Sequence, residues 1–174
     1  MTEDAPWSEE VALAEVSRGK VVRVLDAGEA DRKRIARALG IDQLDQLEAR
    51  ITLTPWLDGA EIDGRWCASI EQTCGLSLDR FASELEGAFL LRVLPPDSPN
   101  APREQGPEVA VDPDAEDPAD VLDGETVDVA AYVVEHLAME IDPFPRKPGA
   151  SWQAPPPEEP ESPFAVLKGL KGEP

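Results

Sequence analysis

The sequence predicts an α+β domain, in which a small antiparallel sheet of about three to five strands is packed by two main helices. Residues 47–54, 61–71 and 84–93 alternate apolar and polar side chains, the period of a half-buried strand. Residues 29–39 and 126–141 repeat apolar side chains at helical spacing. Proline and acidic residues dominate the two remaining segments, which predicts a disordered loop and a disordered C-terminal tail.

These elements indicate one domain over residues 1–150, with a mobile acidic insertion at 95–125 and a tail at 151–174. A β-branched run at 20–25 adds a short strand before the first helix. Asp58 and Gly59 are typical of a hairpin turn between the first two long strands. The alternation places Trp66 on the buried face of the second strand and Cys67 on its polar face.

The second helix is expected to begin at Thr126 as its N-cap and to end near Ile141. Its apolar stripe comprises Val127, Ala130, Ala131, Val134, Leu137, Ala138 and Ile141. The single histidine, His136, falls opposite the middle of this stripe, which predicts a solvated side chain. Four apolar residues lie off the stripe and either form an exposed docking surface or are covered by another segment: Val129, Tyr132, Val133 and Met139.

Acidic residues outnumber basic ones by 36 to 16, and the formal net charge is -20. Such a charge repels nucleic-acid phosphates at long range and attracts basic proteins. Residues 95–125 carry ten of the acidic side chains against one basic one, Arg103. Two interpretations stay open: the charge selects a basic partner, or it only keeps the chain soluble.

The residues for common active sites are missing from the sequence. One histidine and two cysteines, Cys67 and Cys74, cannot supply the usual four cysteine and histidine ligands of a structural zinc site, and no phosphate-binding glycine loop is present. We therefore expect no catalytic residue, no metal and no cofactor. The sequence also lacks a secretory signal and a membrane span, which indicates a cytoplasmic protein with no membrane partner and with reduced thiols.

Two small basic clusters interrupt the acidic chain. Lys33, Arg34 and Arg37 gather on one side of the first helix and are candidate RNA contacts. Arg146 and Lys147 end the second cluster, a proline-stiffened segment that follows the second helix and reads Asp142, Pro143, Phe144, Pro145, Arg146, Lys147. This segment is either a partner-binding site or a complement to the helix dipole.

Two stretches together resemble the YceD family of large ribosomal RNA subunit accumulation proteins. The first contains Gln72, Thr73 and Cys74, followed by Leu78, Phe81, Glu84, Phe89 and the run Arg92-Val93-Leu94-Pro95. The second runs from 127 to 150 and is similar to alphaproteobacterial members. The resemblance covers residues 44–150. Many relatives carry a close pair of cysteines where this chain has only Cys74, followed by Gly75.

The resemblance implies a bacterial, non-enzymatic factor for the synthesis, processing or stability of large-subunit ribosomal RNA. Together with the charge, it favours binding of a basic large-subunit ribosomal protein or a pre-large-subunit particle, with Gln72 to Cys74 and Asp142 to Lys147 as partner-binding candidates. Direct contact with ribosomal RNA through the basic clusters is the alternative. A metal-dependent RNA-processing enzyme is the third hypothesis.

Overall fold

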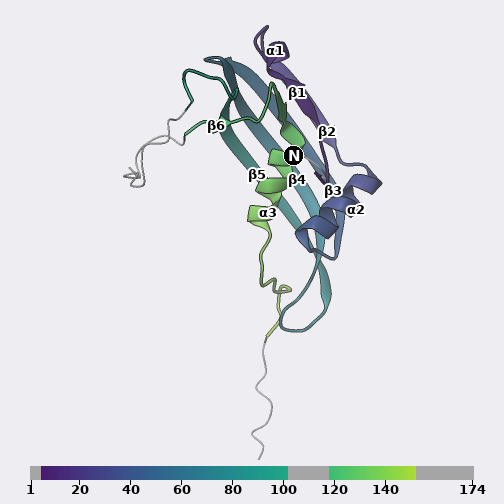
Figure 1. The fold of residues 1–174 in the computed structure, drawn as a ribbon. Coiled ribbons are helices and arrows are strands. Elements are labelled where there is room, and N and C mark those ends of the chain that lie inside the picture. The colour runs from purple at the N-terminus through teal and green to yellow at the C-terminus, as the bar shows by residue number, and fades with distance from the viewer. Residues whose placement is uncertain (1–4, 102–117, 152–174) are drawn as a thin grey trace, which may run out of the picture.

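A computed structural model describes residues 5–101 and 118–151 (Figure 1). This part of the chain contains three helices: α1 (Leu13–Val16), α2 (Glu29–Leu39) and α3 (Val129–Glu140). It also contains seven strands: β1 (Glu10–Ala12), β2 (Val21–Asp26), β3 (Gln43–Trp56), β4 (Gly59–Thr73), β5 (Arg80–Leu94), β6 (Asp120–Val121) and β7 (Thr126–Asp128). The predicted α+β class is confirmed.

The main sheet has the strand order β2-β3-β4-β5-β6, with antiparallel pairs except for β6, which runs parallel to β5. The hairpin turn between β3 and β4 differs from the prediction, because Leu57 and Asp58 form the loop while Gly59 begins β4 opposite Trp56. Only glycine fits at position 59, for a steric reason. A side chain there would collide with the backbone carbonyl of Val93 on β5.

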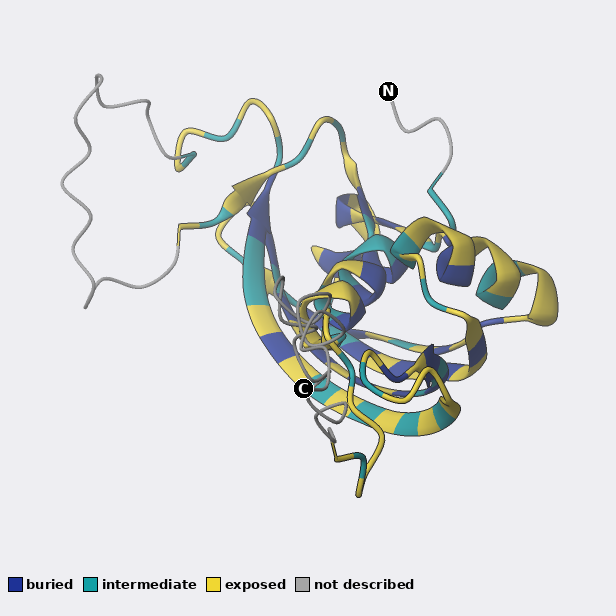
Figure 2. Cartoon of the chain, turned by 90° about the horizontal axis from the view of Figure 1, so that it is seen from below, coloured by how far each residue is buried: buried dark blue, intermediate teal, exposed yellow. Residues whose placement is uncertain are grey.

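Burial alternates along the long strands and gives the sheet two distinct faces (Figure 2). The inner face carries the core side chains of β4, among them Ile62, Trp66 and Ile70, as predicted. The outer face is polar, and the exposed Cys67 lies on it, also as predicted. Glycine and a large ring face each other twice across β4 and β5: Gly64 opposite Phe89, and Trp66 opposite Gly87. The rings fill the space that the glycines leave.

Helix α3 begins at Val129, so the prediction of Thr126 as N-cap is wrong. Thr126 belongs to β7, which pairs with β1 as a separate two-stranded sheet, and Asp128 is the N-cap. The Asp128 carboxylate accepts hydrogen bonds from the backbone N–H groups of Ala130 and Ala131. The pairing with β1 therefore holds residues 126–128 in an extended conformation, although the spacing of their apolar side chains predicts a helix.

The buried surface of α3 is also turned relative to the predicted stripe. Val129 and Val133 are buried, while Ala138 is exposed, so the two valines offer no docking surface. Of the other residues off the stripe, Tyr132 is half-buried and Met139 is exposed. The predicted solvation of His136 is wrong as well, because its ring is half-buried and stacks on Phe89 with 4.3 Å between ring centroids. Helix α3 packs against β1, β4 and β5, and these contacts cover a wider arc of the helix than one stripe.

The predicted mobile insertion at 95–125 needs a correction at its C-terminal end. Asp120 and Val121 form β6, because they pair in parallel with Val93 and Leu94 of β5. Residues 102–117 lie outside the described residues, as does the predicted tail from 152 onward. The predicted domain boundaries remain predictions.

Candidate functional site

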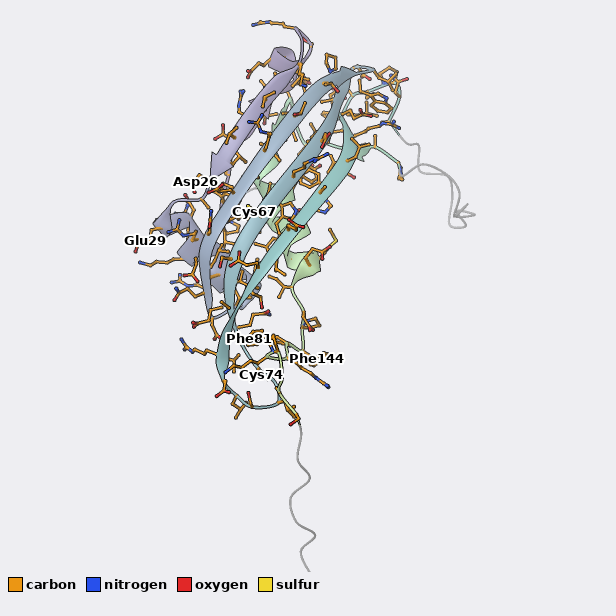
Figure 3. All side chains as sticks on the ribbon, turned by 180° about the vertical axis from the view of Figure 1, so that it is seen from behind. Asp26, Glu29, Cys67, Cys74, Phe81 and Phe144 are labelled. Carbon is orange, nitrogen blue, oxygen red and sulfur yellow. The ribbon has the colours of Figure 1, made fainter. Side chains whose placement is uncertain are left out.

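The two segments singled out in the sequence meet at one end of the sheet. We call this region the pole; it comprises residues 72–80, where β4 turns into β5, and residues 142–147, which follow α3. The Gly75 N–H donates to the Pro145 carbonyl at 2.9 Å, and the Gln72 side-chain amide donates to the Asp142 carbonyl at 3.2 Å. Figure 3 shows Cys74 and Phe144 at this end of the molecule.

Cys74 lies fully buried at the start of the turn, as a small structural side chain would. Its sulfur accepts backbone hydrogen bonds from Leu76 and Ser77, each at 3.4 Å. Hydrogen bonds from the Ser77 side chain and backbone, followed by one from the Lys147 backbone, lower the pKa of the Cys74 thiol to about 6. Cys74 thus holds the turn from within, while the next residue, Gly75, links the turn to the segment after α3.

Nothing in the described ranges brings the two cysteines together. Cys67 lies on the outer face of β4, seven residues before the buried Cys74. No cluster of three or more histidine, cysteine or carboxylate side chains within residues 5–101 and 118–151 has the arrangement of a metal site. Thr73, the middle residue of the motif Gln72-Thr73-Cys74, donates a hydrogen bond from its hydroxyl to the Asp42 carboxylate at 2.6 Å and so connects the pole to the turn after α2.

The pole presents apolar side chains to solvent on a fixed backbone. Phe144 is 80% exposed, and its N–H donates to the Asp142 carboxylate at 2.8 Å, between two prolines. Leu78 is 77% exposed and has a φ of 61°, a left-handed conformation that costs a non-glycine residue about 1 kcal/mol or more. An open cleft of about 290 Å³ runs beside Gln72, Pro143 and Pro145. These features suit a recognition surface.

Most of the candidate cations are already paired with carboxylates. Lys33 pairs with Glu29, Arg34 with Asp31, and Lys147 with Asp79. Arg37 and Arg146 are exposed and make no ion pair with the residues that the structure describes. The C-terminal end of α2 borders the cleft at the pole, so the two basic clusters approach the same end of the molecule. Their net positive charge is smaller than the sequence indicates.

A second candidate site, missed by the sequence analysis, lies at the opposite end of the sheet. An open hollow of about 900 Å³ is formed by the N-terminal segment, the β6–β7 region and α3. We call it the acidic hollow, because five carboxylate residues line it and none of its described lining residues is basic: Glu10, Asp120, Asp123, Asp128 and Glu135. Three of these lie within nine residues of sequence, but only the fold adds Glu10 and Glu135.

Tyr132 supports the wall of the acidic hollow. Its hydroxyl donates a 3.0 Å hydrogen bond to the Asp120 carboxylate. Burial, and then the charge of Asp120, raise the pKa of Tyr132 well above its usual range, so the hydroxyl stays a neutral donor. The negative charge of the hollow therefore comes from carboxylates alone.

The fold and the composition define the class of protein: a small, acidic α+β protein. No helix in the described ranges is long and apolar enough to cross a membrane. Residues 62–171 match the family model described as "Large ribosomal RNA subunit accumulation protein YceD", and the chain belongs to the YceD family. Searches of curated proteins and of solved structures found no match.

The family match begins within β4 and includes both segments of the pole. It starts later than the resemblance at 44–150 and extends further toward the C-terminus. The family is described as an accumulation factor for large-subunit ribosomal RNA, which agrees with the predicted area of function. The alphaproteobacterial type of the family stays a prediction.

Proposed function

We propose that this protein is a non-enzymatic factor that supports the accumulation of large-subunit ribosomal RNA by binding a basic ribosomal protein, free or within a pre-large-subunit particle. The acidic hollow is the observation that carries the proposal, because it collects five carboxylates without a lining cation. Lysine and arginine side chains are the chemistry that such a surface recognises. We place this activity in the cytoplasm, where ribosomal subunits are assembled.

The overall charge of the protein favours the same kind of partner as the acidic hollow does. A formal charge of -20 attracts a basic protein and keeps the factor itself away from RNA phosphates. A bound ribosomal protein would thus have its cations screened until RNA competes for them. Since exposed charges act over a Debye length of about 8 Å at physiological salt, the binding should weaken as salt rises.

Neutralising the hollow should lower capture of basic ribosomal proteins about tenfold. The variant combines Asp120→Asn, Asp123→Asn and Glu135→Gln, and it leaves the helix cap at Asp128 intact. Three exposed ion pairs, each contributing about 0.5 kcal/mol, account for this factor. The measurement is capture of proteins extracted from purified large subunits by the tagged full-length chain, with mass spectrometry, at about 0.05 M and about 0.15 M salt.

The matched control removes the same number of charges elsewhere. Asp26→Asn, Glu48→Gln and Asp63→Asn neutralise exposed carboxylates on the outer face of the sheet, away from the hollow. This control should lose less than half of the capture. Equal losses in both variants would show that net charge alone drives binding, and no captured ribosomal protein at either salt would refute the proposed function.

Direct binding of ribosomal RNA is the second candidate, and the exposure of Phe144 beside Arg146 favours it. An exposed aromatic ring can stack on an unpaired base, and a neighbouring cation can bind the adjacent phosphate. The local pairing of Lys33, Arg34 and Lys147 with carboxylates weakens this candidate relative to the first.

If RNA is bound at the pole, Phe144→Ala should weaken binding of single-stranded large-subunit RNA fragments about tenfold, the loss of one stacked base. Charge reversal of Lys33, Arg34, Arg37, Arg146 and Lys147 together should abolish it. Met139→Ala is the control, because Met139 is also apolar and 69% exposed but lies on α3. Filter binding measures the affinities, and unchanged RNA retention by the charge-reversed variant would eliminate this candidate.

A further inference from the structure

One long strand of the sheet lacks a neighbour over most of its length. β5 extends from Arg80 to Leu94, but within the described residues its second side is paired only where β6 meets Val93 and Leu94. Figure 1 shows β5 at the rim of the sheet, with α3 lying on the inner face. Residues 82–90 therefore form an open edge, a template for an added strand.

The register identifies the backbone groups that face outward along this edge. β4 and β5 pair without a bulge, so successive β5 residues direct their backbone groups alternately toward β4 and away from it. The Leu94 carbonyl accepts from Leu122 beyond the sheet edge, which places even-numbered residues on the outward side. The outward N–H and C=O groups consequently belong to Ala82, Glu84, Glu86, Ala88 and Leu90.

The side chains along the edge indicate what kind of strand fits. On the outer face, Glu84 and Glu86 are exposed carboxylates, and the Ser69 hydroxyl also donates to Glu84. On the inner face, Phe81, Leu85 and Leu91 are only half-buried, and no strand among the described residues lies beside them on the open side of β5. An added strand with alternating basic and apolar residues would satisfy both faces.

The edge is also continuous with the acidic hollow. β6 occupies the next position in the sheet at the end of β5, and its residues Asp120 and Val121 line the hollow. A chain that lies along residues 82–90 is thus directed toward the carboxylates of the hollow at one end. This continuity argues for a basic occupant, because both parts of the path carry negative side chains.

We infer that the open edge of β5 binds an extended, lysine- and arginine-rich segment of the partner by strand addition. The inference rests on the proposed function, since it specifies how the basic partner is held. Main-chain hydrogen bonds supply affinity along the edge, while Glu84 and Glu86 select cations on alternate residues. The acidic hollow receives the cations that follow the strand.

The test uses the full-length chain and an eight-residue peptide of alternating lysine and valine with blocked ends. The peptide should slow amide hydrogen exchange at Glu84, Glu86 and Ala88 by at least about tenfold, because their N–H groups gain acceptors. Ser83 and Leu85 should change less, since their N–H groups already face β4. A control peptide has the same sequence but carries a methyl group on every second backbone nitrogen, on the side that would pair with β5. It keeps its charge and should no longer protect these amides of the protein.

A variant of the protein gives a second, independent arm. Ala88→Pro removes one outward N–H, and proline is tolerated at such edge positions, whereas Ala88→Thr retains the N–H as the matched control. Ala88→Pro should reduce the peptide-induced protection at least about tenfold relative to Ala88→Thr. Thermal melting of both variants checks the fold, and the methylated peptide keeps the inference testable if the proline variant fails to fold.

Two outcomes would overturn the inference. Equal binding of the methylated and unmethylated peptides would show that charge, not strand addition, holds the segment. Protection of the same amides in the free protein would show that the edge is already occupied. Either result leaves the capture of ribosomal proteins by the acidic hollow unaffected, whereas loss of that capture would refute the proposed function itself.

Discussion

Replacing Asp128 by alanine is expected to lower the free energy of unfolding by about 3 kcal/mol. One carboxylate oxygen of Asp128 accepts three backbone N–H groups: those of Ala130 and Ala131 at the start of α3, and that of Glu9 at 2.9 Å. Loss of the helix cap costs about 1 kcal/mol, and leaving the part-buried Glu9 N–H without a partner costs about 2 kcal/mol more. For a chain of this length, the melting temperature should fall by about 10 °C.

The expected loss of stability is large because Asp128 connects three elements. It ends β7, it caps α3, and its bond to Glu9 fixes the segment that enters β1. Urea unfolding followed by circular dichroism measures the change. Asp128→Asn retains an acceptor oxygen and should recover most of the stability, while Asp123→Ala removes an exposed carboxylate of the hollow and should cost under about 0.5 kcal/mol. Equal losses for Asp128→Ala and Asp123→Ala would contradict the capping role.

The long strands were predictable because each has one face in the core. In β4 the buried positions recur every second residue, a period that a helix does not have, and they are Ile62, Gly64, Trp66, Ala68 and Ile70. The strands β1 and β7 have three residues each and exist only because Glu10, Val11 and Ala12 find partners more than a hundred residues away. Such a pairing leaves no periodic signal, which is why the prediction places the N-cap of α3 two residues early, at Thr126 instead of Asp128.

The two candidate sites also differ in how far the sequence could predict them. The sequence singles out the segments 72–74 and 142–147 because each carries a recognisable motif, and their role in binding stays a prediction. That the two segments meet, through the bond between Gly75 and Pro145, could not be predicted. The acidic hollow depends on Glu10 and Glu135 meeting Asp120 and Asp123. In a chain with 36 acidic residues, no spacing distinguishes these four from the rest.

The contact between Gly64 and Phe89 leads to a second large effect. A Cβ atom at Gly64 would overlap the Phe89 ring, and the ring cannot move away freely because His136 stacks on its other face with an interplanar angle of 2°. Gly64→Ala should therefore destabilise the protein by about 3 kcal/mol, the upper range for overpacking a core. Gly75→Ala is the matched control, since its nearest neighbour, the Pro145 carbonyl oxygen, would lie 3.8 Å from the new Cβ.

A double-mutant cycle separates this overlap from a general intolerance of β4 to larger residues. Phe89→Leu alone removes the ring and its stacking on His136, and it should cost about 1–2 kcal/mol. Combined with Gly64→Ala, it makes room for the new methyl group, so the double variant should be more stable than the sum of the single changes by at least about 1 kcal/mol. Additive free energies of unfolding would mean that the Phe89 ring is not what excludes a side chain at position 64.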